Sequence, residues 1–240
     1  MFSKNFFYRV KYQINKKATF QVFFHFFLDR LKHPFIKSQK QKYRKKHQKY
    51  LETKKTSTDF FSINSYYWNR IIKKNFKEFS YLEIGSWEGN SASFILKNFK
   101  TKKVICVDIW DKYDDDEYKN EHLRRFENFQ YNLNEFRERF SFFKNTSDEF
   151  FKNNKEDFDI IYIDGDHEAP QVYRDLHNSW NSLNINGMII CDDYFSGEIR
   201  DNLDNNLPAN SINKFLLDKK DKVKIVCVNN SQIFLQKVSN

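Results

Sequence analysis

Cysteine, proline and glycine are scarce in this sequence of 240 residues, which contains three, three and five of them respectively. The cysteines Cys106, Cys191 and Cys227 are odd in number, and each lies inside an apolar run. A small secreted domain that depends on disulfides usually carries an even and larger set of cysteines. The scarcity therefore argues against a disulfide framework and favours reduced thiols in the core of a cytoplasmic protein.

Long hydrophobic runs are also missing. A membrane-spanning helix needs roughly 20 consecutive apolar residues, and the nearest candidate, residues 18–28, is about half that length. Gln21 and His25 interrupt it, and no small-residue cleavage site of the kind found in a secretory signal follows. We therefore expect neither a transmembrane helix nor a secretory signal.

Acidic residues are rare at the N-terminal end of the chain. Residues 1–60 contain 16 Lys and Arg but only Asp29, Glu52 and Asp59 as acids, which gives this part a formal charge of +13. Because the whole chain has a net charge of +9, the remaining residues carry −4. A basic segment on a mildly acidic body indicates attraction to an anionic surface, which could be phospholipid, nucleic acid or an acidic glycan.

From about residue 79 onward, short β-branched or aromatic runs alternate with stretches of helical period. This alternation is typical of a parallel sheet with covering helices. The last two strands are separated by only three residues, too few for a crossover helix, so they should pair antiparallel. The predicted strands are residues 79–84, 104–109, 140–143, 158–163, 187–191, 223–228 and 232–236.

Helices are predicted between these strands. In residues 169–183, Val172, Leu176, Trp180 and Leu183 recur at steps of three and four and form one apolar stripe, with Pro170 near the helix start. The other predicted helices are residues 91–98, 116–132, 147–153 and 211–219.

Residues 1–56 are predicted to be a basic, aromatic extension, and residues 57–240 the main domain. Phe20, Phe23, Phe24, Phe27, Leu28 and Leu31 mark an amphipathic helix, which a polar charged run over residues 37–55 follows. A further helix is expected over residues 57–74, capped by Ser57 or Thr58, with an apolar face that could cover a cofactor cleft.

A glycine-containing turn follows the first predicted strand. Gly85 and Gly89 lie between that strand and a helix, an arrangement in which backbone amides approach a bound cofactor. Asp108 ends the next strand about 20 residues later, where an acid can accept hydrogen bonds from both ribose hydroxyls. An ordinary turn and an ordinary strand-end acid are the alternatives, but the paired spacing favours a nucleotide-like cofactor.

Four segments resemble the class I S-adenosylmethionine-dependent methyltransferases, most closely the methyltransferase 24 family. They are Leu-Glu-Ile-Gly-Ser-Trp-Glu-Gly-Asn-Ser, Val-Asp-Ile-Trp, Asp-Ile-Ile-Tyr-Ile-Asp-Gly-Asp-His and Gly-Met-Ile-Ile-Cys-Asp-Asp-Tyr, all within residues 79–200. Trp87 stands where broader class I enzymes often have a third glycine, which disfavours a nicotinamide enzyme. The resemblance implies S-adenosylmethionine as cofactor, with contacts from Glu83, Gly85, Ser86, Gly89, Asp108, Ile109 and Asp164.

The predicted fold class is therefore α/β, a Rossmann-like class I methyltransferase fold. It has a seven-stranded, mostly parallel sheet with an antiparallel C-terminal hairpin, and an N-terminal helical extension.

Carboxylates follow two further strands, Asp164 after the fourth and Asp192 and Asp193 after the fifth. Ligands bind beyond the carboxyl ends of parallel strands, and neighbouring strands are about 4.8 Å apart. Three carboxylates so close would repel one another unless a cation or protons neutralised them, and oxygen ligands suit magnesium. We predict that these three residues bind Mg²⁺, which would hold and activate an acceptor hydroxyl. A turn after a buried strand is the alternative.

Asp166 and His167 are the candidates for removing the acceptor's proton. Histidine titrates near neutral pH, and an aspartate beside a metal would stay ionised and could accept a proton. The alternative is that the two residues cap the following helix.

The predicted reaction is methylation of a hydroxyl oxygen on a small molecule, by resemblance a sugar. Methylation of a nucleic-acid base is disfavoured, since Pro34, Pro170 and Pro208 are isolated and the Asp/Asn-Pro-Pro-aromatic motif is missing. A ribose methyltransferase that uses the basic arm, or a non-catalytic binding protein of the same fold, is the alternative. For residues 1–56 we expect peripheral association with an anionic membrane, or else a solvated tail.

Overall fold

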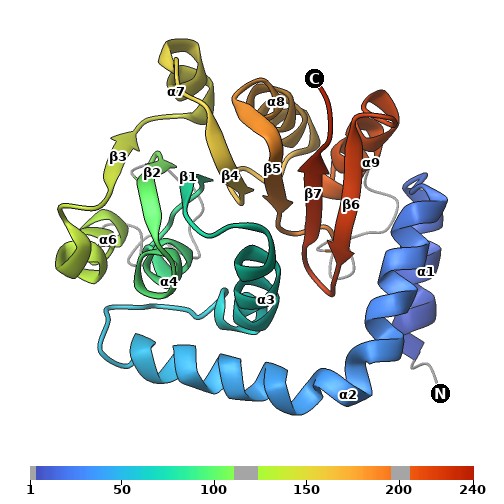
Figure 1. The fold of residues 1–240 in the computed structure, drawn as a ribbon, viewed down its shortest axis with the longest axis horizontal. Helices are drawn as coiled ribbons and strands as arrows, with labels where there is room; N and C mark the ends of the chain where they lie inside the picture. The colour runs from blue at the N-terminus through green and yellow to red at the C-terminus, as the bar shows by residue number, and fades with distance from the viewer. Residues whose placement is uncertain (1–3, 111–123, 196–205) are drawn as a thin grey trace. The chain divides into compact units, whose positions relative to one another are not determined.

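A seven-stranded sheet in the order β3-β2-β1-β4-β5-β7-β6 is the centre of the computed structural model, which describes residues 4–110, 124–195 and 206–240 (Figure 1). The chain forms two compact units, residues 33–153 and residues 1–32 with 154–240. The strands are β1 (Phe79–Ile84), β2 (Thr101–Asp108), β3 (Ser141–Lys144), β4 (Phe158–Ile163), β5 (Leu183–Cys191), β6 (Val223–Val228) and β7 (Ile233–Lys237).

In the unit of residues 33–153, β1 pairs parallel with β2, and β2 pairs parallel with β3. Ile84 lies opposite Val107, so the last residues of β1 and β2 reach the same edge of the sheet. Both strands are apolar runs because a parallel strand is covered on its two faces. The helices of this unit include α3 (Ser65–Asn75), α4 (Asn90–Asn98), α6 (Arg125–Leu133) and α7 (Ser147–Asn153), with 3-10 turns η1 (Ser62–Asn64) and η3 (Asn134–Phe136).

In the unit of residues 1–32 with 154–240, β4 pairs parallel with β5, while β7 pairs antiparallel with both β5 and β6. The predicted C-terminal hairpin is thereby confirmed. Helices α8 (Ala169–Asn181) and α9 (Pro208–Asp218) belong to this unit, as does α1 (Lys4–Asn15). Helix α2 (Phe20–Leu51) begins in it and continues beyond residue 32.

All seven predicted strands are confirmed, with ends that differ by a few residues. Val172, Leu176 and Trp180 bury the predicted stripe of α8, but the helix ends at Asn181, and Leu183 opens β5 instead. Residues 116–123 of the helix predicted over 116–132 lie outside the described residues, and α6 confirms its second half.

The helix predicted to start at Ser57 begins only at Ser65, so the predicted cap was wrong. The backbone N–H and the hydroxyl of Ser57 instead donate to Glu88 Oε2, at 2.7 and 3.0 Å. Asp59 Oδ1 then accepts from the N–H of Ser62, at 2.8 Å, at the start of η1. A carboxylate distant in sequence therefore competes successfully with the local tendency of Ser57 to cap a helix.

The three cysteines form no disulfide with one another, and Cys106 and Cys191 are buried within β2 and β5. The expected reduced cysteines thus agree with the structure. Among the described residues, no helix combines the length and the apolar character that crossing a membrane requires.

Candidate active site

The turn after β1 is built on two glycines with left-handed backbone conformation. Gly85 has φ +84°, and its N–H donates to the carbonyl of Val107 at 2.8 Å, which ties the turn to β2. Gly89 has φ +78° and is the residue from which α4 begins. Side chains with a Cβ rarely adopt these angles, so glycine is favoured at both positions.

Gly89 is also closely packed. A Cβ at this position would lie 3.1 Å from Phe129 Cδ2 and 3.2 Å from Leu133 Cγ, both on α6. The sequence prediction was that Gly89 lets the loop pass close to a ligand. The structure supplies a different reason for the glycine, namely the contact between the start of α4 and α6.

Asp108 closes the turn from the end of β2. Its Oδ2 accepts from the N–H of Trp87 at 2.8 Å, and its Oδ1 accepts from the N–H of Trp110 at 2.9 Å. Burial raises the pKa of Asp108, while these N–H groups and the nearby Arg125 act in the opposite direction. The predicted pairing of Asp108 with the glycine turn is therefore present, and a carboxylate oxygen retains a second lone pair for a ribose hydroxyl. Ile109, the next residue, is half-buried.

Glu83 is fully buried one residue before the end of β1. Tyr81 donates its hydroxyl to Oε2 at 2.5 Å, and Ser91 donates its hydroxyl to Oε1 at 2.9 Å. Glu83 thus connects the strand to the first turn of α4. Ser86, also predicted to contact the cofactor, is buried in the turn itself.

Glu88 holds the same turn in place, and sequence reasoning did not single it out. Its Oε2 accepts from the backbone N–H of Ser57 at 2.7 Å, and its Oε1 accepts from the side-chain amide of Asn128, also at 2.7 Å. The amide of Asn132 donates to the carbonyl of Glu88 at 2.9 Å. The one feature of the sequence that could have pointed to Glu88 is its place as an acidic residue in a glycine turn. Its hydrogen-bond partners come from segments distant in the sequence.

Trp87, the departure from the broader glycine pattern, has a positive φ of +45°. The guanidinium carbon of Arg125 lies 3.2 Å from the centre of its ring, and Trp110 Nε1 donates to its carbonyl at 2.7 Å. A cation over an aromatic face and a backbone hydrogen bond compensate for the unfavourable backbone angle.

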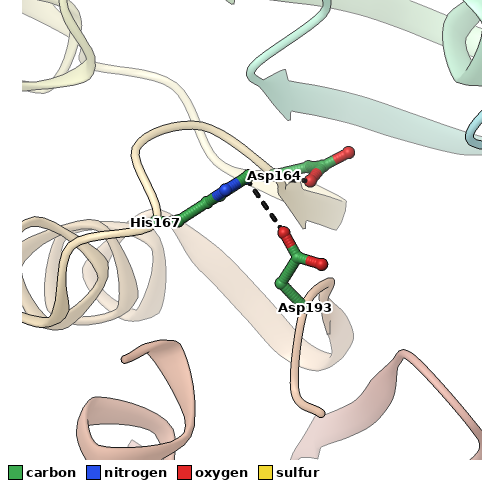
Figure 2. A group of neighbouring side chains, drawn as sticks. All are labelled: Asp164, His167 and Asp193. Carbon is green, nitrogen blue, oxygen red and sulfur yellow. Dashed lines mark ion pairs between the residues drawn. The ribbon is translucent and has the colours of Figure 1, made fainter. Parts of the chain in front are cut away.

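The second group of predicted residues lies at the ends of β4 and β5. These strands pair in parallel with Ile163 opposite Cys191, which brings the residues after them to one edge. Asp164, His167 and Asp193 converge there, with one ligand atom from each lying within 4.8 Å of the others (Figure 2). His167 Nε2 is 3.0 Å from Asp193 Oδ2 and 3.8 Å from Asp164 Oδ1.

The two carboxylates determine the charge of the histidine. Asp164 and Asp193 raise the pKa of His167 to about 10, although burial acts in the opposite direction. His167 is therefore an imidazolium ion at neutral pH, and it cannot accept a proton until it loses that one. Burial, followed by the charge of Asp193, raises the pKa of Asp164, while His167 opposes this rise.

The Asp164–His167–Asp193 cluster fits a divalent cation. Two carboxylate oxygens and an imidazole nitrogen form a donor set that transition metals accept readily and that magnesium accepts through its oxygens. The proton on His167 now supplies the positive charge that balances the two carboxylates. A divalent cation that bound to the imidazole nitrogen would displace this proton.

Asp192, the third predicted metal ligand, lies next to the cluster and makes hydrogen bonds of its own. Tyr162 Oη lies 2.5 Å and Gln232 Nε2 lies 2.8 Å from Asp192 Oδ2, while Oδ1 accepts from the N–H of Asp193 at 2.8 Å. Tyr162 Oη is also 2.7 Å from Asp164 Oδ2, although a phenol has only one hydrogen to donate. Burial and the neighbouring carboxylates raise the pKa of Asp192 to about 7. Near neutral pH the Asp192 carboxyl group can therefore be protonated and donate to the Tyr162 oxygen, while the Tyr162 hydroxyl donates to Asp164.

Asp166 is exposed, and its Oδ1 accepts from the N–H of Glu168 at 2.8 Å just before α8. Glu168 precedes the helix as its cap residue without a capping side-chain bond. Asp166 thus shapes the turn before the helix without capping it, and its exposure leaves the second carboxylate oxygen accessible. No described contact brings Asp166 to the Asp164–His167–Asp193 cluster.

A buried ring of hydrogen bonds joins the N-terminal helix to the residue after Asp193. Gln13 Nε2 donates to the carbonyl of Tyr194 at 3.1 Å, and Tyr194 donates its hydroxyl to Asn213 Oδ1 at 2.5 Å. Asn213 Nδ2 completes the ring by donating to Gln13 Oε1 at 3.0 Å. Next to it, Tyr12 and Phe26 pack against Phe195, with ring centres 6.4 and 5.0 Å apart.

The strand order, the antiparallel final strands and the turn after β1 define the class I S-adenosylmethionine-dependent methyltransferase fold. Residues 82–194, just under half of the chain, match the family model described as a methyltransferase domain, methyltransferase 24. In this match and in its fold, the chain is similar to S-adenosylmethionine-dependent methyltransferases.

One curated relative is an uncharacterized protein of Acanthamoeba polyphaga mimivirus, 29% identical over 121 residues. The match covers 49% of this chain and 52% of the relative, so the similarity spans about half the length of each protein. This relative adds nothing on activity.

Solved structures share the fold at low sequence identity. The O-methyltransferase from Bacillus cereus in complex with SAH is 13% identical, with a TM-score of 0.56 over 90% of this chain and 99% of that one. MycE methyltransferase of the mycinamycin pathway, solved with Mg, SAH and mycinamycin VI, is 16% identical, with a TM-score of 0.53 over 75% of this chain and 50% of that one. An rRNA methylase from Streptococcus thermophilus is 10% identical, with a TM-score of 0.51 over 77% and 100%. The fold alone therefore does not identify the substrate.

Proposed function

We propose that this enzyme transfers the methyl group of S-adenosylmethionine to a hydroxyl oxygen of a small molecule, which a divalent cation at Asp164, His167 and Asp193 helps to bind. The observation that carries the proposal is the convergence of these three side chains after β4 and β5. A methyltransferase that acts by proximity alone has no need for such a cluster.

The donor site is proposed at the turn after β1. Gly85 and its bond to Val107 fix the turn, and Asp108 stands at the end of β2 with lone pairs available to ribose hydroxyls. Glu83, Ser86, Gly89, Ile109 and Asp164 remain predicted cofactor contacts. Glu83 also connects β1 to α4, because its two oxygens accept bonds from Tyr81 and Ser91.

The cation is proposed to be Mg²⁺, in keeping with the magnesium present in the MycE structure. A bound divalent cation would lower the pKa of an acceptor hydroxyl and so make its oxygen a better nucleophile. Asp164 and Asp193 would hold the cation through their oxygens, with His167 as the nitrogen ligand. Asp192 would take part by orienting its neighbours through Tyr162 and the N–H of Asp193.

In the transfer, the acceptor oxygen forms a bond to the methyl carbon while the bond between that carbon and the sulfonium sulfur breaks. The products are the methyl ether and S-adenosylhomocysteine, and the hydroxyl proton must leave. His167 could be the base only in place of its role as a ligand, and only after losing the proton that the two carboxylates favour. Asp166 is the other candidate base, because its exposed carboxylate has an oxygen that no described residue occupies.

A small-molecule acceptor is favoured over RNA by the acidic cluster, since a phosphate backbone would be repelled by carboxylates at the acceptor site. The basic N-terminal segment favours the second candidate, a ribose methyltransferase. A sugar hydroxyl remains the acceptor implied by the family resemblance.

The test is methyl transfer from labelled S-adenosylmethionine into a metabolite extract and, separately, into total RNA, each with and without Mg²⁺. We expect label in a small-molecule product, dependence on the cation, and a loss of about a hundredfold or more in Asp193→Asn. Asp221→Asn, at an exposed position outside the cluster, is the matched control and should retain full activity. Label in RNA without added cation would overturn the proposal, and binding of the donor without any transfer would favour a non-catalytic protein.

A further inference from the structure

The first turns of α2 carry apolar side chains on two opposite faces. Val22 and Phe26 are 1% and 2% exposed, and Phe26 packs against Phe195 within the unit of residues 1–32 and 154–240. The other face carries Phe20, Phe24, Phe27 and Leu31, whose exposed fractions are 81%, 50%, 40% and 48%. We call these four residues the aromatic stripe.

The aromatic stripe is one continuous surface of the helix, because its members follow each other at steps of four, three and four residues. A helix that is apolar on both faces is expected to be covered on both. Phe7 and Ile14 of α1 are 63% and 60% exposed as well. Elsewhere in the described part of this unit, the large apolar residues with comparable exposure are Ile185, Leu217 and Val238, and they lie on separate segments.

The charge around the aromatic stripe has one sign. Residues 1–32 contain seven Lys and Arg, and Asp29 is their one acidic residue. Asp29 is buried, whereas Lys11, Lys17 and Lys32 are exposed. Farther along α2, the exposed basic residues are Lys37, Lys42, Arg44, Lys45, Lys46 and Lys49.

We propose that the aromatic stripe docks on an anionic lipid membrane. An amphipathic helix with aromatic residues on one side and lysines beside them lies in the interface, with its rings at the boundary between headgroups and acyl chains. The nearby lysines add electrostatic attraction to an anionic leaflet. A second copy of the chain is disfavoured as the occupant, because it would bring an equally basic segment against this one.

The test is cosedimentation of the full chain with vesicles of phosphatidylcholine alone or of phosphatidylcholine mixed with phosphatidylglycerol. We expect pelleting with the anionic vesicles and little with the neutral ones. The variant Phe20→Ser/Phe24→Ser/Leu31→Ser should lower the partition coefficient by roughly tenfold or more, since it removes three exposed apolar side chains from the interface. The matched control is Ile185→Ser/Leu217→Ser, which should pellet like the native chain.

A charge variant separates the two contributions. Lys11→Glu/Lys17→Glu/Lys32→Glu should weaken binding to anionic vesicles without exposing the core, and circular dichroism checks that each variant keeps its helices. Failure of the native chain to pellet, or equal pelleting of the native chain and the serine variant, would overturn the proposal. Light scattering that shows a dimer in the native chain and a monomer in the serine variant would assign the aromatic stripe to self-association and also overturn it.

Discussion

His167 lies beside two carboxylates, and its proton competes with any cation that uses the same nitrogen. Because Asp164 and Asp193 raise its pKa to about 10, nearly all copies are protonated at neutral pH. The affinity for Mn²⁺, used here as a stronger-binding substitute for Mg²⁺, should therefore rise with pH by up to about tenfold per pH unit below that pKa. Titration calorimetry between about pH 6.5 and about pH 8.5 measures this slope.

The slope has a matched control in His167→Gln. Glutamine can offer an oxygen to the cation but carries no titrating proton in this range, so binding should be weaker and its pH dependence smaller, with the part due to Asp192, whose pKa is about 7, remaining. A native chain whose Mn²⁺ affinity is the same across this range would show that His167 is not a ligand. The proposed donor set would then shrink to the carboxylates.

Sequence position predicted Asp108, Asp164 and Asp193 correctly as residues at strand ends, because parallel strands deliver such residues to a common edge. Sequence position did not show that His167, and not Asp192, lies with Asp164 and Asp193 in the cluster. Asp192 Oδ2 lies within hydrogen-bond distance of Tyr162 and Gln232, and Gln232 is 40 residues away in the chain. Nothing in the local pattern around Asp192 reports that contact.

At the scale of elements, helix α1 supports the loop that carries Asp193. Gln13→Ala would leave the buried carbonyl of Tyr194 and the amide of Asn213 without one partner each. An unsatisfied buried polar group costs about 1–3 kcal/mol, so the free energy of unfolding should fall by roughly that amount. We also expect Mn²⁺ affinity to fall severalfold, because Tyr194 directly follows Asp193.

Urea unfolding and Mn²⁺ titration measure the two effects separately. Gln21→Ala, at an exposed position of α2, is the control and should change neither. If Gln13→Ala lowers stability but leaves Mn²⁺ affinity unchanged, the ring of hydrogen bonds holds α1 in place without influencing the cluster.

Most of the strands could be predicted because they are largely apolar runs bounded by turn residues, as strands covered on both faces tend to be. The edge strand β3 is mostly exposed, and its short aromatic run was the signal. The ends of the helices were harder to predict from the sequence. Residues 57–64 do not continue the pattern of α3, since Glu88, distant in sequence, holds Ser57. The packing of α1 against α9 likewise joins residues about 200 positions apart, so a charged and aromatic N-terminal segment gave no sign of it.

For the whole molecule, the loss of stability at low pH depends in part on a buried histidine that the folded chain keeps neutral. His47 of α2 is 4% exposed and lies against Phe61 and Phe94, with ring centres 5.4 and 5.2 Å away. Burial lowers its pKa from 6.5 to about 4, so the folded chain binds this proton less readily than the unfolded chain does. Its contribution to stability is therefore complete above about pH 6.5 and is lost as the pH falls toward 4.

The shift corresponds to about 3 kcal/mol of unfolding free energy, since one pKa unit is about 1.36 kcal/mol. His47→Phe keeps an aromatic ring of similar shape among Phe61 and Phe94 but cannot take up a proton. Chemical denaturation at pH 7 and pH 4 should show the native chain losing about 3 kcal/mol more than this variant does. Both chains share every other acid-sensitive group, including His167, so the difference between them isolates His47. Equal losses would mean that water reaches the imidazole and that this part of α2 is not closed over Phe61.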